Sequence, residues 1–177
     1  MKNALKFSLI TIVAITFACN RTKHPKYVAK IDSLLVNIDS LEMKYNEINI
    51  DTLKAKFELV DANTKIIKTM DNIDLNENAE VKKALINYGK IHKSFKWYIK
   101  SYKKSNEDLA FNKKQLETLR DDISNNLIAD DKIEKFFTDE AQAVQNSNNS
   151  ILFYYKDVKA SLSIYEETEI EIGKIIK

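Results

Sequence analysis

The sequence predicts an all-α protein: a long antiparallel three-helix bundle with the shape of a coiled-coil-like rod. Residues that turn or break a helix are almost absent, since Pro25 is the only proline and Gly89 and Gly173 are the only glycines. Apolar residues recur at alternating steps of three and four, which is the spacing of a helical seam. The periodic stretches divide the chain into three segments of similar length, as expected for an up-down-up bundle.

The first helix is predicted from about residue 27 to residue 70. The tetrapeptide Ile-Asp-Ser-Leu begins at Ile31 and again one heptad later at Ile38. The pattern shifts by about one residue near Thr52, a drift expected when an α-helix is not held to a strict 3.5-residue repeat. The predicted seam residues are Ile31, Leu34, Ile38, Leu41, Tyr45, Ile48, Leu53, Phe57, Val60 and Ile67.

The second helix is predicted over residues 78–127, after the polar stretch Asp71–Asn76, whose side chains compete for backbone hydrogen bonds. Its seam, interrupted by polar Asn106, Lys113 and Arg120, consists of Val81, Leu85, Tyr88, His92, Phe95, Ile99, Tyr102, Leu109, Leu116, Ile123 and Leu127. No strong helix breaker lies within it. A turn in the polar run 103–108 is the alternative, and a break near Ser105 would give a four-helix bundle.

The third helix follows a short turn at Ala129–Asp130, with Asp131 and Glu134 as an acidic capping box. Its predicted seam consists of Ile133, Phe137, Ala141, Val144, Asn148, Ile151, Tyr155, Val158, Leu162, Tyr165, Ile172 and Ile176. Each of the three helices has about 45 to 50 residues and is therefore about 70 Å long. Equal helices joined by short connections fold most simply in antiparallel order.

The N-terminus has the pattern of a secretory signal peptide. Lys2 and Lys6 precede the uncharged run Phe7–Ala18. This run is well short of the roughly 20 apolar residues that a transmembrane helix needs, so a permanent membrane span is the weaker interpretation. The whole chain has 28 Lys and Arg against 26 Asp and Glu. Removing the signal leaves a formally neutral chain, which gives no support for a nucleic-acid partner.

The signal ends in Thr16–Cys19, which resembles the bacterial lipobox in having a small residue before the cleavage point and a cysteine after it. The resemblance implies a diacylglycerol on the sulfur of Cys19 and an N-acyl chain on its amino group, with no other cofactor. Two or three acyl chains make a stable membrane anchor. The implied parts are a signal peptide at 1–18, a lipidated tether at 19–26 and a helical bundle domain at 27–177.

The sequence lacks the residue patterns of an active site, so a protein without catalytic activity is predicted. Its only imidazoles belong to His24, which we expect to be exposed in the tether, and His92, which we expect to pack on the seam of the second helix. No cysteine cluster, His-Glu-x-x-His or glycine-rich phosphate loop is present, and no metal site is predicted.

A stripe of lysines around one tryptophan is the strongest candidate for a binding site. The stripe consists of Trp97 with Lys90, Lys93, Lys96, Lys100 and Lys104. At 100° per residue Trp97 falls on the lysine side of the helix rather than on the seam. The up-down-up arrangement favours a second interpretation, an internal aromatic cluster of Trp97 with Phe153, Tyr154 and Tyr155. In the same arrangement the acidic residues Glu166, Glu167, Glu169 and Glu171 lie beside Lys82 and Lys83.

These observations predict a non-catalytic, membrane-anchored lipoprotein of the bacterial cell envelope. We expect it to act as a helical scaffold or protein-interaction module, with an envelope protein or a second copy of itself as partner. The alternative is a module that binds a cell-wall polymer or another anionic ligand through the lysine and aromatic stripe. Asn20 is not the aspartate that retains some lipoproteins in the inner membrane, so we expect the outer membrane, facing the periplasm.

Overall fold

The computed structural model describes residues 22–70 and 78–177, and these residues form four α-helices. The helices are α1 (Pro25–Asn46), α2 (Ile50–Lys68), α3 (Ala79–Ser124) and α4 (Asp130–Ile175). No β-strand occurs in these two ranges, so the prediction of an all-α fold is confirmed. None of the four helices is long and apolar enough to span a membrane. The predicted signal peptide, Cys19 and the connection Asp71–Asn76 lie outside the described residues.

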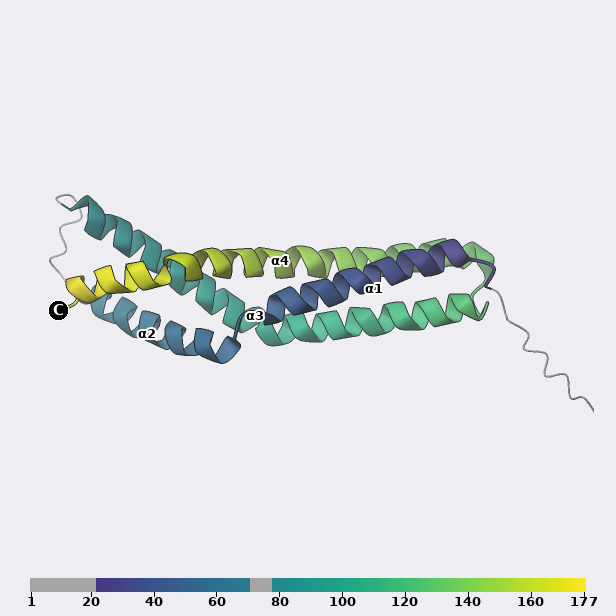
Figure 1. Cartoon of the computed structure of the whole chain (residues 1–177), viewed down its shortest axis with the longest axis horizontal. Helices are drawn as coiled ribbons and strands as arrows, with labels where there is room; N and C mark the ends of the chain where they lie inside the picture. The colour runs from purple at the N-terminus through teal and green to yellow at the C-terminus, as the bar shows by residue number, and fades with distance from the viewer. Residues whose placement is uncertain (1–21, 71–77) are drawn as a thin grey trace, which may run out of the picture.

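The molecule is a rod in which α3 and α4 run antiparallel along its whole length (Figure 1). Helix α1 lies beside one half of this pair and α2 beside the other half. Together α1 and α2 take the place of the predicted first helix, so the chain runs up, down and up as expected. Helix α3 continues through Ser105, and the alternative with a turn there is wrong. The fourth helix arises from a break at Glu47–Asn49 instead.

The break resolves the change of phase that the sequence has near Thr52. A continuous, drifting helix was the prediction, but the chain stops α1 and restarts α2 in a new phase. Asn49 caps the new helix, because its side-chain oxygen accepts hydrogen bonds from the backbone N–H groups of Asp51 and Thr52 at 3.1 and 2.9 Å. Restarting the helix places Leu53 and Val60 fully in the core.

Tyrosine side chains from α3 donate hydrogen bonds to residues at the end of α1. The hydroxyl of Tyr98 donates to the backbone carbonyl of Tyr45, which has lost its helical partner at the break. The ring of Tyr45 lies against the rings of Tyr98 and Tyr102, with centroids 4.7 and 5.6 Å apart. Burial raises the pKa of Tyr45 and of Tyr98, so both hydroxyls stay protonated donors. Tyr102 completes the cluster by donating to the side chain of Asn46 at 2.9 Å.

The buried face of α3 differs by one residue from the predicted seam along one of its two rows. The row of Tyr88, Phe95, Leu109, Leu116 and Ile123 is buried as predicted, but its partner row is Ala84, Ile91, Tyr98, Ser105, Asn112 and Leu119. The row of Leu85, His92, Ile99, Asn106, Lys113 and Arg120 is only half-buried. Helix α4 shows the same displacement, with Ser161 buried and Leu162 half-buried.

Asn112, a buried polar residue on the displaced row of α3, has a polar partner on α4. The amide of Asn112 on α3 donates to the hydroxyl of Ser147 on α4 at 2.9 Å. A buried polar side chain is tolerated when a partner replaces the water it loses. Hydrophobic periodicity ranks polar positions as exposed, so it favours the adjacent row, whose first half contains Leu85 and Ile99.

The half-buried polar row of α3 pairs with acids of α1 at heptad spacing. Lys113 donates to Asp39 at 2.7 Å, and Arg120 lies 3.6 Å from Asp32. The two acids are the second residues of the repeated Ile-Asp-Ser-Leu tetrapeptide, and the two bases are also seven residues apart. Such exposed pairs add little stability, and their equal spacing agrees with the antiparallel packing of α1 against α3.

The turn between α3 and α4 is a helix-ending motif that uses an asparagine in the left-handed region. Asn126 has φ 55°, its N–H donates to the carbonyl of Ile123, and the N–H of Leu127 donates to the carbonyl of Asp122. Leu127 is 72% exposed, so its predicted place on the seam is wrong. The capping box predicted with Asp131 is also wrong, because α4 starts after Ala129 with no side-chain cap.

Replacing Tyr98 by Phe tests the role of the tyrosine at the break. Tyr98→Phe leaves the buried carbonyl of Tyr45 without a donor, and we expect the free energy of unfolding to fall by about 1 to 3 kcal/mol. Urea denaturation followed by circular dichroism measures this change. Tyr27→Phe is the matched control, because the Tyr27 hydroxyl has no hydrogen-bond partner among the described residues. An equal effect of both substitutions would contradict the role given to Tyr98.

Candidate functional site

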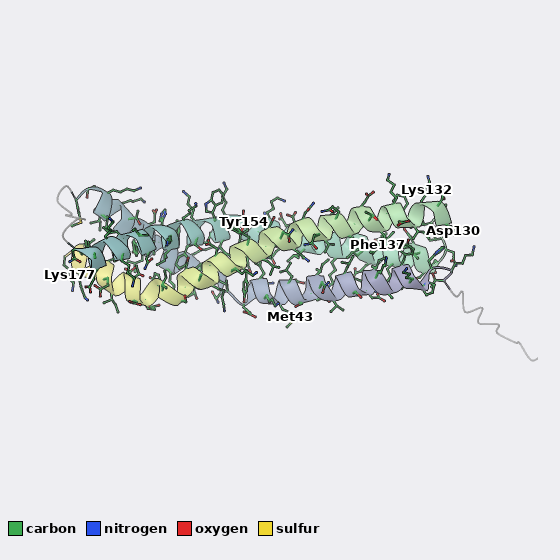
Figure 2. The ribbon with its side chains drawn as sticks, turned by 90° about the horizontal axis from the view of Figure 1, so that it is seen from above. Met43, Asp130, Lys132, Phe137, Tyr154 and Lys177 are labelled. Carbon is green, nitrogen blue, oxygen red and sulfur yellow. The ribbon has the colours of Figure 1, made fainter. Side chains whose placement is uncertain are left out.

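A surface groove between α3 and α4 is the candidate site. Its volume is about 430 Å³, and it is lined by Lys90, Lys93, Ser94, Trp97, Phe153, Tyr154 and Asp157. Tyr154 marks its position part-way along α4, well away from the turn at Asp130 (Figure 2). The structure therefore brings Trp97 and two of the predicted lysines together with two aromatic residues of α4.

The aromatic residues of the groove lie at the surface of the rod. Trp97 is 44% exposed and Phe153 is 66% exposed, and the rings of Phe153 and Tyr154 meet edge to face with centroids 5.6 Å apart. The predicted internal cluster is therefore wrong, although its members do share a height on the two helices. Adjacent helical residues diverge by about 100°, so Tyr154 and Tyr155 cannot face the same way. Tyr155 instead donates to Glu47 at the helix break.

Several lysines at the groove carry charge that the described residues do not neutralise. Lys90 and Lys93 line the groove, and exposed Lys96 lies beside it in sequence. None of the three forms an ion pair within residues 22–70 and 78–177. Asp157 is the single acid in the lining. The groove therefore combines exposed apolar surface with a net positive charge.

The remaining predicted lysines differ in their surroundings. The Nζ atom of Lys100 lies 5.2 Å from the centroid of the Trp97 ring, which is cation–π distance and holds the lysine over the indole. Lys104 does not line the groove and binds both carboxylate oxygens of Asp108, at 2.9 and 2.7 Å. The charge of Lys104 is therefore paired within α3, unlike the charges of Lys90 and Lys93.

Ser94 gives the groove a polar group that the sequence pattern did not single out. Its residue is only 3% exposed, and its Oγ atom is buried without a hydrogen-bond partner in the described part of the chain. A buried hydroxyl without a partner costs free energy. Ser94 lies in the wall of the groove with its hydroxyl covered.

Each of the two histidines lies within hydrogen-bond distance of an acid. The Nε2 atom of His92 lies 2.9 Å from Asp61, and its ring lies against Phe57, so His92 is a packed residue between α2 and α3. The Nε2 atom of His24 lies 3.0 Å from Asp130. His24 was expected to be exposed in a solvated tether, and this expectation is wrong because its side chain is held on the α3–α4 turn.

The acidic residues near the end of α4 divide between α2 and α3. Glu169 accepts hydrogen bonds from the hydroxyl of Tyr88 and from the amide of buried Asn63, both at 2.8 Å. Glu166 pairs with Lys56 at 2.6 Å. The predicted neighbours Lys82 and Lys83 form no ion pair within the described ranges. Lys83 only shares a small hollow with Glu167 and Glu171.

No known protein identifies the site. No protein-family model, curated protein or solved structure matches the chain. Within the described ranges, no three side chains of His, Cys, Asp or Glu come together in a way that would hold a metal ion. Evidence for a function therefore rests on the groove and on the sequence of the N-terminus.

The Asp61 carboxylate should make the stability of the contact between α2 and α3 sensitive to acid. Hydrogen bonds from Lys65 and His92 lower the pKa of this carboxyl from 3.8 to about 2. A lowered pKa in the folded state adds stability above about pH 4, and this is lost as pH falls towards 2. We expect Asp61→Asn to flatten the fall of the melting temperature between pH 5 and pH 2. Glu58→Gln, which removes an exposed carboxylate of the same helix, should keep the wild-type slope.

Proposed function

We propose that the chain is a non-catalytic protein of the bacterial cell envelope, anchored by lipid on Cys19, whose helical rod presents the groove to a partner. The observation that carries this proposal is the groove itself, where half-exposed Trp97 lies among lysines without carboxylate partners. The signal peptide and the lipobox resemblance support the anchor. Asn20 supports an outer-membrane location facing the periplasm.

The chemistry of the groove suits an acidic protein surface. Tryptophan and tyrosine are the residues that most often anchor protein interfaces, because they bury a large apolar area with few rotatable bonds. The lysines would steer an acidic partner and exclude basic ones. We therefore take an envelope protein with an acidic patch as the partner, and the rod as a scaffold that holds it.

A cell-wall polymer is the second candidate, and it is favoured by the polar groups of the groove. The ammonium groups of Lys90 and Lys93 are hydrogen-bond donors beside aromatic faces. Precisely placed polar groups in an otherwise apolar site are typical of small-molecule and saccharide-sized ligands. An anionic glycan would use the same lysines as an acidic protein.

Substitution of Trp97 tests the protein-partner proposal. Native membranes are gently crosslinked, the full-length protein is purified by affinity, and partners and the N-terminal peptide are identified by mass spectrometry. We expect an acylated Cys19 and one stoichiometric envelope partner. Removing a tryptophan anchor costs about 2 kcal/mol or more, about 30-fold in affinity, so Trp97→Ala should lose the partner.

Two matched controls separate the groove from the rest of the rod. Phe111→Ala removes a 62% exposed aromatic residue of α3 outside the groove and should retain the partner. Lys90→Gln should weaken capture, whereas Lys104→Gln should not, because Lys104 is already paired with Asp108. Loss of the partner in every variant, or in none, would contradict the proposal.

The same variants decide between protein and polymer in co-sedimentation with purified peptidoglycan. Pelleting of the wild type that is lost in Trp97→Ala and retained in Phe111→Ala, with no captured protein, would replace the first candidate by the second. An unmodified Cys19 on an uncleaved chain would contradict the anchor, whichever ligand the groove binds.

A further inference from the structure

The start of the described chain is fixed to the turn between α3 and α4. The hydroxyl of Thr22 donates to the carbonyl of Ile123 at 3.1 Å, and the backbone N–H of Lys23 donates to the side chain of Asn126 at 3.1 Å. His24 adds its contact with Asp130. Three successive residues therefore bind the last turn of α3, the connection and the first turn of α4.

This attachment limits how far the turn can be from the lipid. Cys19 precedes Thr22 by three residues. An extended chain spans at most about 3.6 Å per residue, so the two Cα atoms are no more than about 11 Å apart. An acylated Cys19 lies at the bilayer surface by necessity. Thr22, which is hydrogen-bonded to the turn, is then held within about the same distance of that surface.

We propose that the α3–α4 turn is a membrane-contact surface and that Leu127 enters the bilayer at the boundary between the headgroups and the acyl chains. This inference rests on the proposed lipid anchor. Leu127 is 72% exposed although its neighbour Ile128 packs against the core, so an apolar side chain projects from the tip of the rod. A bilayer is the one apolar partner that the short link to Cys19 keeps beside this tip at all times.

The charges at the turn agree with a contact of this kind. The exposed charges of the turn and the adjoining helix ends balance, with three basic and three acidic residues: Lys23, Lys26, Lys132, Asp121, Asp130 and Asp131. Figure 2 shows Asp130 and Lys132 together at this end. The contact therefore depends on the tether and on Leu127, and needs no excess of anionic lipid.

The same geometry places the groove away from the lipid. Tyr154 follows Asp130 by 24 residues of continuous helix, which is about 36 Å of rod. A rod attached by its turn holds the groove beyond the headgroups, in the aqueous compartment. The occupant of the groove is then a protein or polymer of that compartment and not a lipid headgroup.

Tryptophan fluorescence tests this orientation, because Trp97 is the only tryptophan of the chain. The full-length, lipid-modified protein is reconstituted into vesicles of brominated phosphatidylcholine, which quenches indoles that touch acyl chains. In the double variant Trp97→Phe with Leu127→Trp, we expect most of the emission to be lost. Wild-type Trp97 should keep its emission in these vesicles and be quenched by aqueous iodide.

The control is Trp97→Phe with Ile170→Trp, which places an indole at a 63% exposed site near the other end of α4. We expect it to behave like wild-type Trp97. Both new indoles replace exposed apolar side chains, so the helical circular dichroism should not change. Bromolipid quenching of Trp97 as strong as that at position 127 would mean a rod lying flat, and it would overturn the orientation.

Vesicle flotation separates the failure of this inference from failure of the anchor. Acylated protein that floats with vesicles, while the indole of Leu127→Trp stays unquenched, overturns the membrane contact alone. Protein that does not float, or that carries no acyl chains on Cys19, overturns the proposed anchor and the orientation together.

Discussion

The hydrogen bond from the hydroxyl of Tyr98 to the backbone carbonyl of Tyr45 satisfies the end of α1 and so allows the chain to break there and begin α2. The rest of the structure is arranged around this break. At this height, two neighbouring residues on each of α3 and α4 face opposite ways. Tyr98 and Tyr155 turn towards the break, whereas Trp97 and Tyr154 turn outward to the groove. The groove and the break therefore lie at one height of the rod, and the core tyrosines hold the backbone that positions the exposed aromatic residues.

The polar contacts between helices differ in kind between the two halves of the rod. Beside α1, exposed ion pairs repeat every seven residues, as in Asp39 with Lys113. Beside α2, buried Asn63 bonds Tyr88 and Glu169 in one network, which burial makes expensive to break. Burial and the nearby carboxylate also raise the pKa of Tyr88, so its hydroxyl remains a donor to Glu169 at any physiological pH.

Much of the fold could be predicted from the sequence, because apolar spacing and the shortage of turn residues report on helices directly. The three helical segments and one of the two buried rows of α3 were predicted from this signal. The break did not, since a one-residue phase shift is compatible with both a drifting helix and two helices. The displaced rows were missed because Ser105 and Asn112 are polar and yet buried. For the groove, Trp97 and the lysines were predicted, but Ser94 has no periodic signal that would have marked it.

The repeated acids of α1 have a consequence for the length of the rod. Asp32 and Asp39 meet bases that are also one heptad apart, so removing seven residues from each of α1, α3 and α4 would leave every remaining pair in register. Each such change alters the rod by about 10 Å. The half between the turn and the groove is therefore a spacer whose span is adjustable in heptad steps without a change in the tip or in the groove.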